Sequence, residues 1–174
     1  MALFRKRLSF AEAVEKLLTV VGGANDLLKR LAHDNAHLVR VIVPVEVDWL
    51  VAEFVALRLF GVLVATKNTR YQDWESRGRE LFDSVEERVV ASTAVLRDQS
   101  KVLAQSWLYD RLEIYGVSAN MGSSQPIGRE IGKSFSMMMS DPDAPTDALS
   151  GLGWSIFDQA VAQVFAIQSE YKLA

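Results

Sequence analysis

The chain has 174 residues, which suits a single domain spanning 1–174 with a core large enough to fold without disulfides or metal. Hydrophobic residues make up 49% and charged residues 24%, so a disordered or collagen-like chain is excluded. The net charge of −3 argues against a nucleic-acid partner. The absence of cysteine excludes disulfides and thiol nucleophiles, and it fits a cytoplasmic protein in a reducing compartment.

The N-terminal segment 1–8 contains three consecutive cations at positions 5–7. The long apolar stretch of a signal peptide does not follow, because acidic residues interrupt the sequence from Glu12 onward. We therefore interpret 1–8 as a basic arm that leads into a helix. An alternative is that residues 1–10 dock on a membrane surface, since four large apolar side chains accompany the cations.

A capping box predicts the start of the first helix. Ser9 can accept a free backbone amide while Glu12 reaches back to the amide of Ser9. Apolar residues at helical spacing follow, and the glycine pair 22–23 ends the helix. A second helix is expected from Asn25 or Asp26.

Two histidines four residues apart, His33 and His37, would lie on one face of this second helix. Paired imidazoles can hold zinc, nickel or copper, with a third ligand from Glu46, Asp48 or a partner chain. If the cofactor were haem, only one histidine would be its proximal ligand. The alternative is a pair of solvated histidines near the end of a helix, with no cofactor.

The most apolar stretch, 45–65, predicts a helix that begins near Pro44. Four charged residues within it make a membrane span unfavourable, because each costs about 2.5–3.5 kcal/mol near the centre of a bilayer. We expect a buried central helix over 44–65 instead.

Residues 73–115 predict a long amphipathic helix with room for one break. Apolar residues recur every seven positions, but the companion positions of a coiled coil are mostly polar. This pattern is typical of a bundle helix; the repeating residues are Phe82, Val89, Leu96 and Leu103.

Two loops and two helices complete the chain. The segment 116–128 is rich in glycine and serine, and 140–146 contains two prolines. A short helix is expected over 129–139, and a long one with a broad apolar face over 147–171. Gly128 and Gly132 are spaced for a close approach between helices.

A group of large flexible and aromatic residues is the candidate contact site for a partner. Met137, Met138 and Met139 follow Phe135 closely, and Trp154 lies on the last helix. Three adjacent methionines cannot all face one way on a helix, so at least one is expected at the surface. Core filling is the alternative interpretation of the same residues.

The sequence as a whole predicts an all-α bundle of five or six helices around the apolar 44–65 helix. It contains neither a nucleophile elbow nor the glycine fingerprint of a dinucleotide site. We therefore expect a non-enzymatic interaction or regulatory module that forms a homodimer or binds another protein. Ligand binding at His33 and His37 and membrane docking through 1–10 stay open as alternatives.

Overall fold

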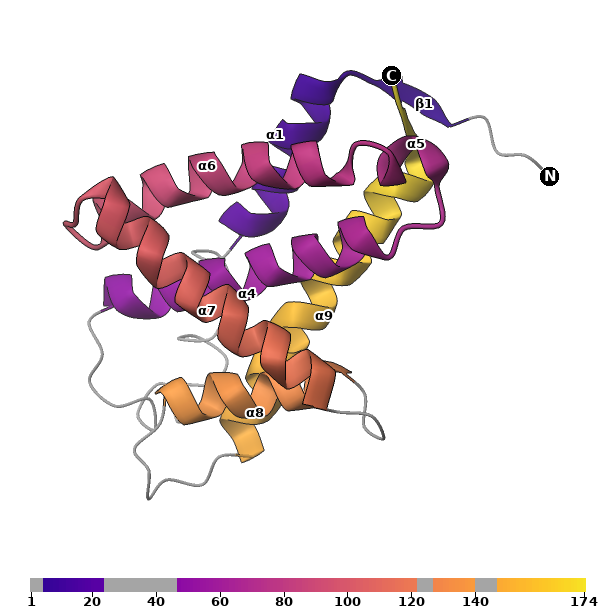
Figure 1. The fold of residues 1–174 in the computed structure, drawn as a ribbon. Coiled ribbons are helices and arrows are strands. Elements are labelled where there is room, and N and C mark those ends of the chain that lie inside the picture. The colour runs from indigo at the N-terminus through magenta and orange to yellow at the C-terminus, as the bar shows by residue number, and fades with distance from the viewer. Residues whose placement is uncertain (1–4, 24–46, 122–126, 140–146) are drawn as a thin grey trace.

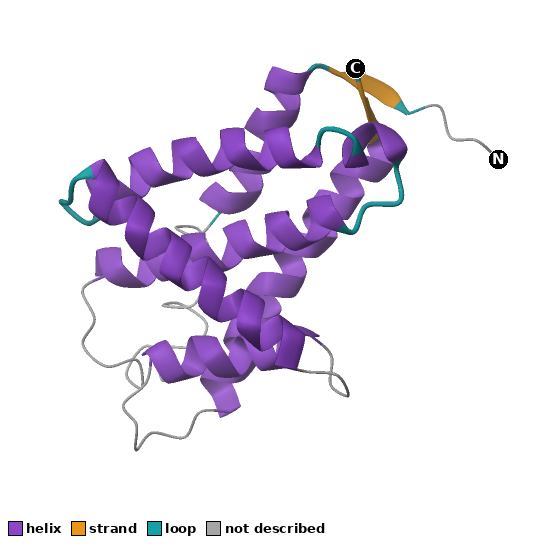
Figure 2. Cartoon of the chain, viewed as in Figure 1, coloured by secondary structure: helices purple, strands orange, loops and turns teal. Residues whose placement is uncertain are grey.

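The computed structural model describes residues 5–23, 47–121, 127–139 and 147–174. Within these ranges the chain forms seven helices and two short strands (Figures 1 and 2). The predicted all-α class is therefore confirmed. The predicted second helix and the start of the central helix near Pro44 lie outside the described residues. The elements are β1 (Lys6–Leu8), α1 (Phe10–Gly22), α4 (Val47–Lys67), α5 (Gln72–Glu75), α6 (Gly78–Leu96), α7 (Lys101–Met121), α8 (Ile127–Met139), α9 (Asp147–Glu170) and β2 (Tyr171–Leu173).

Helix α4 is the buried centre of the bundle, as the sequence predicts. Helices α1, α6, α7 and α9 all pack against it. It is long and apolar enough to cross a membrane, but 83% of that apolar stretch is buried inside the fold. Its two buried charged residues are bonded: Arg58 donates to the carbonyl of Val20 and to Gln163, and Glu53 is described below. The apolar run is thus explained by packing among other helices.

The predicted capping box starts α1. The backbone amide of Ser9 donates to a carboxylate oxygen of Glu12 at 2.8 Å, and the amide of Glu12 donates to the hydroxyl of Ser9 at 3.3 Å. The helix ends at Gly22, at the glycine pair that the sequence marks. These local contacts satisfy amides that would otherwise lack partners at a helix start.

The described part of the basic arm is not a free extension. Its residues Lys6–Leu8 form β1, which pairs in parallel with β2 at the other end of the chain, with Lys6 opposite Tyr171. Figure 1 shows β1 and the C-terminal end at the same corner of the molecule, beside α5. Residues 165 positions apart leave no local pattern, so neither strand was predicted.

Asp73 of α5 holds this corner together. Its carboxylate accepts from the Arg5 guanidinium at 2.9 Å and from the backbone amide of Leu173 at 2.8 Å. The indole of Trp74 donates to the carbonyl of Tyr171 at 3.0 Å. The first and last described segments are therefore joined through α5.

The predicted long helix over 73–115 is instead three helices, α5, α6 and most of α7. The turn between α6 and α7 contains Asp98 in the left-handed conformation, with φ of 48°. This turn resets the helical register, so the seven-residue pattern does not continue across it. Phe82 and Val89 are buried on α6, whereas Leu103 on α7 is exposed.

The predicted loop 116–128 is wrong at both ends, because α7 continues to Met121 and α8 begins at Ile127. Tyr115 is fully buried and anchors the helix immediately before this segment. Further on, the hydroxyl groups of Ser118 and Ser134 lie 2.6 Å apart and join α7 to α8. Tertiary contacts thus outweigh the low helix propensity of glycine and serine.

Helices α8 and α9 pack closely through glycines. A Cβ atom at Gly128 would overlap the indole of Trp154, and one at Gly132 would overlap the backbone carbonyl of Ser150. A Cβ at Gly153 would lie 2.7 Å from the ring of Phe135. The close approach predicted from the spacing of Gly128 and Gly132 is confirmed.

Candidate functional site

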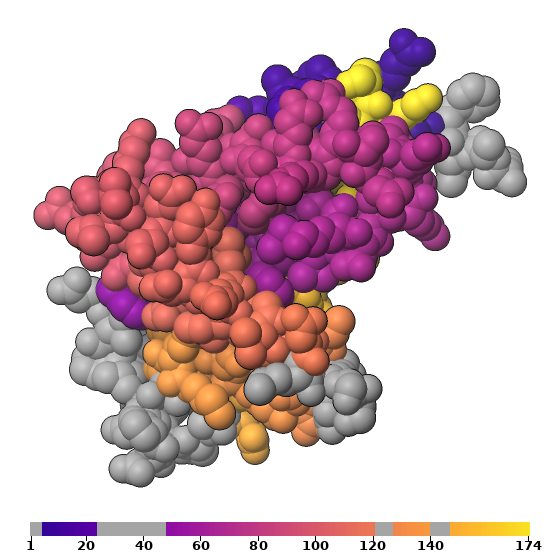
Figure 3. Space-filling model, in the orientation of Figure 1, coloured from indigo at the N-terminus to yellow at the C-terminus, as the bar shows by residue number. Residues whose placement is uncertain are grey.

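Exposed large apolar side chains concentrate on the outward side of α7. Figure 3 shows this helix, in orange-red, lying across the front surface of the molecule. Val102 is 75% exposed and Val117 is 50% exposed. We call this side of the helix the α7 outer face. It consists of five exposed large apolar residues and three exposed polar residues: Val102, Leu103, Ser106, Tyr109, Asp110, Glu113, Ile114 and Val117.

Helix α7 is apolar on both of its sides. Its inner side is buried against the core through Ala104, Leu108 and Tyr115. At 100° per residue, the members of the α7 outer face fall on the opposite side as one continuous stripe. A surface helix normally presents polar residues to water, so the apolar outer stripe makes this side of α7 a candidate contact surface.

Two acidic residues interrupt this stripe. Asp110 and Glu113 are exposed, and neither carboxylate has an ion pair among the residues described. They would tolerate water when the face is open, and they would require donors when it is covered. The face thus combines apolar contact area with two unpaired negative charges.

A cluster of arginine and tryptophan side chains around Arg97, which we call the Arg97 cluster, flanks the α7 outer face. The Arg97 guanidinium lies 4.4 Å from the ring centre of Trp107 and 5.0 Å from that of Trp49. The two rings meet edge to face with centres 6.1 Å apart. These cation–π contacts hold the guanidinium over the two rings.

Several donors in this cluster are buried and have no acceptor among the residues that the structure describes. They are Nε and Nη1 of Arg97 and the indole Nε1 of Trp107. Buried donors that lack an acceptor cost free energy, about 1–3 kcal/mol each. Burial lowers the pKa of the Arg97 guanidinium, and the positive charge of nearby Arg111 lowers it further, against the opposing effect of Glu53.

Glu53 supplies the only carboxylate inside this cluster among the described residues. It is fully buried on α4, and its oxygens accept from Nε of Arg111 and from the hydroxyl of Tyr115, each at 2.8 Å. Burial raises the pKa of Tyr115 well above its ordinary value, and Glu53 raises it further, so the hydroxyl stays a donor. One carboxylate faces two guanidinium groups, which leaves the cluster with net positive charge.

The five predicted partner residues fall into two groups. Phe135 and Met139 are buried in the core, and Met138 is half-buried against it, so the surface interpretation does not hold for them. Met137 is 76% exposed and Trp154 is 38% exposed, which confirms that at least one methionine reaches the surface. A helix of this pitch cannot turn Met137 and Met139 to the same side.

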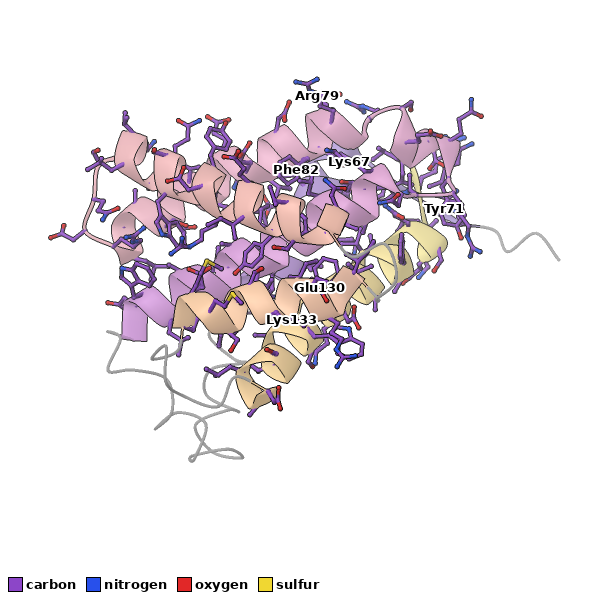
Figure 4. All side chains as sticks on the ribbon, turned by 60° about the horizontal axis from the view of Figure 1, so that its bottom comes forward. Lys67, Tyr71, Arg79, Phe82, Glu130 and Lys133 are labelled. Atoms are coloured by element: carbon purple, nitrogen blue, oxygen red, sulfur yellow. The ribbon has the colours of Figure 1, made fainter. Side chains whose placement is uncertain are left out.

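Met137 and Trp154 line one groove between α8 and α9. Its volume is about 460 Å³, and Arg129, Lys133 and Asp147 also line it. Lys133 is paired with Glu130 at 2.7 Å. Figure 4 labels both residues on α8. The prediction of a partner contact at Met137 and Trp154 stays a prediction.

Another groove lies where α4 ends and α6 begins, with a volume of about 520 Å³. Figure 4 shows Lys67, Arg79 and Phe82 gathered there. Glu75 and Asp83 also line the groove. Because both signs of charge are mixed around it, the groove has no single field that would select a charged ligand.

The predicted metal or haem ligands His33 and His37 lie outside the described residues, as do residues 1–4 of the proposed membrane arm. Among the residues that the structure does describe, there is no group of three His, Cys, Asp or Glu side chains that could hold a metal ion. The described part of the arm is held by protein contacts, since Lys6 pairs with Glu170 at 3.1 Å and Leu8 is buried.

Comparisons with protein-family models, curated proteins and solved structures gave no match to this chain. The α7 outer face and the Arg97 cluster were not predicted from the sequence. A helical projection of 101–121 would have shown apolar residues on all sides. It could not have shown which side the core covers, because that depends on the turn at Asp98.

Proposed function

We propose that this protein is a helical interaction module that binds a second copy of itself through the α7 outer face. The observation that carries the proposal is the apolar stripe of α7, with Val102, Leu103, Tyr109, Ile114 and Val117 open to water. Covering these side chains stabilises a complex by about 25 cal/mol per Å² of apolar area removed from water.

A symmetric dimer suits this surface. Two-fold dimers are the commonest soluble oligomers, and they use the same patch on both subunits. One long straight helix offers such a patch, because a helix of 21 residues is about 31 Å long. The α8–α9 groove around Met137 and Trp154 is the competing contact surface, and the experiment below separates the two.

The test compares single charged substitutions on the two surfaces. Val102→Lys places a cation at one end of the proposed interface, and Met137→Lys places one in the α8–α9 groove. Both side chains are largely exposed, so neither change should lower the stability of the monomer by more than about 0.5 kcal/mol.

Sedimentation velocity over a range of concentrations measures the outcome. We expect a wild-type dimer, an unchanged dimer for Met137→Lys, and a dissociation constant at least tenfold higher for Val102→Lys. A wild-type chain that stays monomeric at the highest concentration would refute the proposal. Loss of the dimer only in Met137→Lys would show that the interface lies in the α8–α9 groove and not on the α7 outer face.

A further inference from the structure

We infer that self-association through the α7 outer face is linked to proton uptake, so that the dimer tightens as the pH falls from neutral. This inference rests on the proposed function, because it assigns a form of regulation to the interface proposed above. It draws on three observations: the position of two carboxylates within the α7 outer face, the lack of cations beside them, and a third carboxylate without a donor in the adjoining groove.

The two carboxylates lie along the middle of the α7 outer face. At 100° per residue, Asp110 and Glu113 each fall within about 30° of the centre line of the stripe. The exposed apolar side chains that flank this line on its two sides are Val102, Tyr109, Leu103 and Ile114. Any surface that removes these side chains from water therefore covers both carboxylates as well.

The cations of α7 itself do not neutralise these carboxylates. At 1.5 Å per residue, Lys101 lies about 14 Å from Asp110 and about 18 Å from Glu113 along the helix axis. Both separations exceed the screening length of about 8 Å at physiological salt. The other cation of α7, Arg111, is held by the buried carboxylate of Glu53 on α4.

The turn before α7 and the neighbouring helix α8 do not supply a counter-charge either. The Arg97 guanidinium lies over two tryptophan rings, and its Nε and Nη1 atoms are closed to solvent. On α8, Lys133 pairs with Glu130, and Arg129 lines the α8–α9 groove. Two copies joined through this face therefore enclose four carboxylates, two from each copy, and no cation from either face.

The groove that adjoins the α7 outer face shows how a carboxylate behaves there without a donor. The groove lies between α6 and α7, has a volume of about 450 Å³ and reaches the face at Tyr109; Glu87 and Lys101 also line it. Glu86 lines it as well, and its Oε1 atom is buried with no donor among the described residues. Burial raises the pKa of Glu86, and the negative charge of Asp83 raises it further.

Formation of the dimer applies the same two effects to the α7 outer face. Contact removes water from Asp110 and Glu113, and the identical face of the second copy adds two more negative charges. Both effects favour the protonated carboxyl over the carboxylate. A protonated carboxyl is also a hydrogen-bond donor that a carboxylate can accept. The dimer therefore binds more protons than two separate copies, and by linkage its dissociation constant falls as the pH falls.

Sedimentation velocity of the full chain between about pH 7.5 and about pH 5.5 tests this linkage. We expect the dissociation constant of the wild-type dimer to fall about tenfold or more over this range. The test variant Asp110→Asn, Glu113→Gln has neither carboxylate. At neutral pH it should bind about tenfold more tightly than wild type, and its dissociation constant should no longer change with pH.

A matched control removes two exposed carboxylates away from the face, in the double variant Glu75→Gln, Asp158→Asn. Control and test variant have the same net charge, so the control measures any effect of overall charge on association. Both variants keep the two histidines of the chain, which titrate in the same pH range. The control should follow wild type at every pH.

A wild-type dimer whose dissociation constant does not change over this range would refute the inference, and Val102→Lys would then show whether the α7 outer face still forms the interface. PH dependence that persists in the test variant, or that disappears in the control, would refute it as well, because the protons would then bind elsewhere. A chain that stays monomeric at every pH and concentration would overturn the interface and the inference together.

Discussion

A carboxylate in the middle of an apolar helix is costly unless its oxygens are bonded. Glu53 meets this requirement through two donors on α7, Arg111 and Tyr115. The bonds also fix α7 against α4, because both donors come from the side of α7 that faces the core. The α7 outer face points to solvent as a consequence of this buried contact.

Glu53→Gln should destabilise the fold by about 2–4 kcal/mol, because it leaves the mostly buried Arg111 guanidinium without its counter-charge. Urea unfolding followed by circular dichroism measures the change. The control Glu80→Gln breaks a solvent-exposed pair with Arg77 and should cost less than about 1 kcal/mol. Equal losses in the two variants would contradict a structural role for Glu53.

At the scale of elements, the pair α8 and α9 shows how glycine determines packing. The backbones approach so closely at Gly132 that no side chain fits against Ser150. Gly151 lies on α9 in the same region, but no atom lies within 4 Å of the place where its Cβ would be. A side chain is therefore excluded at Gly132 but fits at Gly151, although both glycines lie in helices.

Gly132→Ala should destabilise the protein by about 1–3 kcal/mol, because the methyl group would force α8 away from α9. Gly151→Ala should stabilise it by about 0.5–1 kcal/mol, since alanine is the better helix former and nothing obstructs it. Thermal unfolding of both variants provides the measurement. A stabilised Gly132→Ala would mean that the two helices lie farther apart than described.

At the scale of the whole molecule, Asp73 links the first and last described segments of the chain. Burial alone would raise its pKa, but the bonds from Arg5 and from the amide of Leu173 outweigh this and hold the pKa below its ordinary value of 3.8. A lowered pKa in the folded state means that the ionised form stabilises the fold. That stabilisation is complete at a pH above the pKa of Asp73 in the unfolded chain. It is lost as the pH falls through the pKa of Asp73 in the folded protein.

Asp73→Asn should therefore be about 1.5 kcal/mol less stable than wild type near pH 6. The difference should shrink as the pH is lowered below about 4, because the wild type then loses the same charge. Urea unfolding at a series of pH values measures this difference in stability. The control Asp158→Asn should stay close to wild type at every pH. A difference that does not change with pH would exclude a role for the charge.

Several features of the structure could be predicted from short stretches of the sequence. The capping box of α1, the glycine stop after it, the glycine contacts of α8 and the burial of the apolar central helix all follow from neighbouring residues and simple spacing. Phe135 and Met139, two of the candidate contact residues, are buried; the sequence shows that adjacent methionines point in several directions but not which direction the core occupies.

The sequence by itself therefore determined the helical class and the central position of α4, because helical periodicity and hydrophobicity are local properties. Only the tertiary structure decided three other features: the pairing of β1 with β2, the extension of α7 to Met121, and the side of α7 that faces water. Each depends on contacts between residues far apart in the chain or on the single turn at Asp98. Such contacts leave no periodic trace in the sequence, since the residues that make them are separated by unrelated segments.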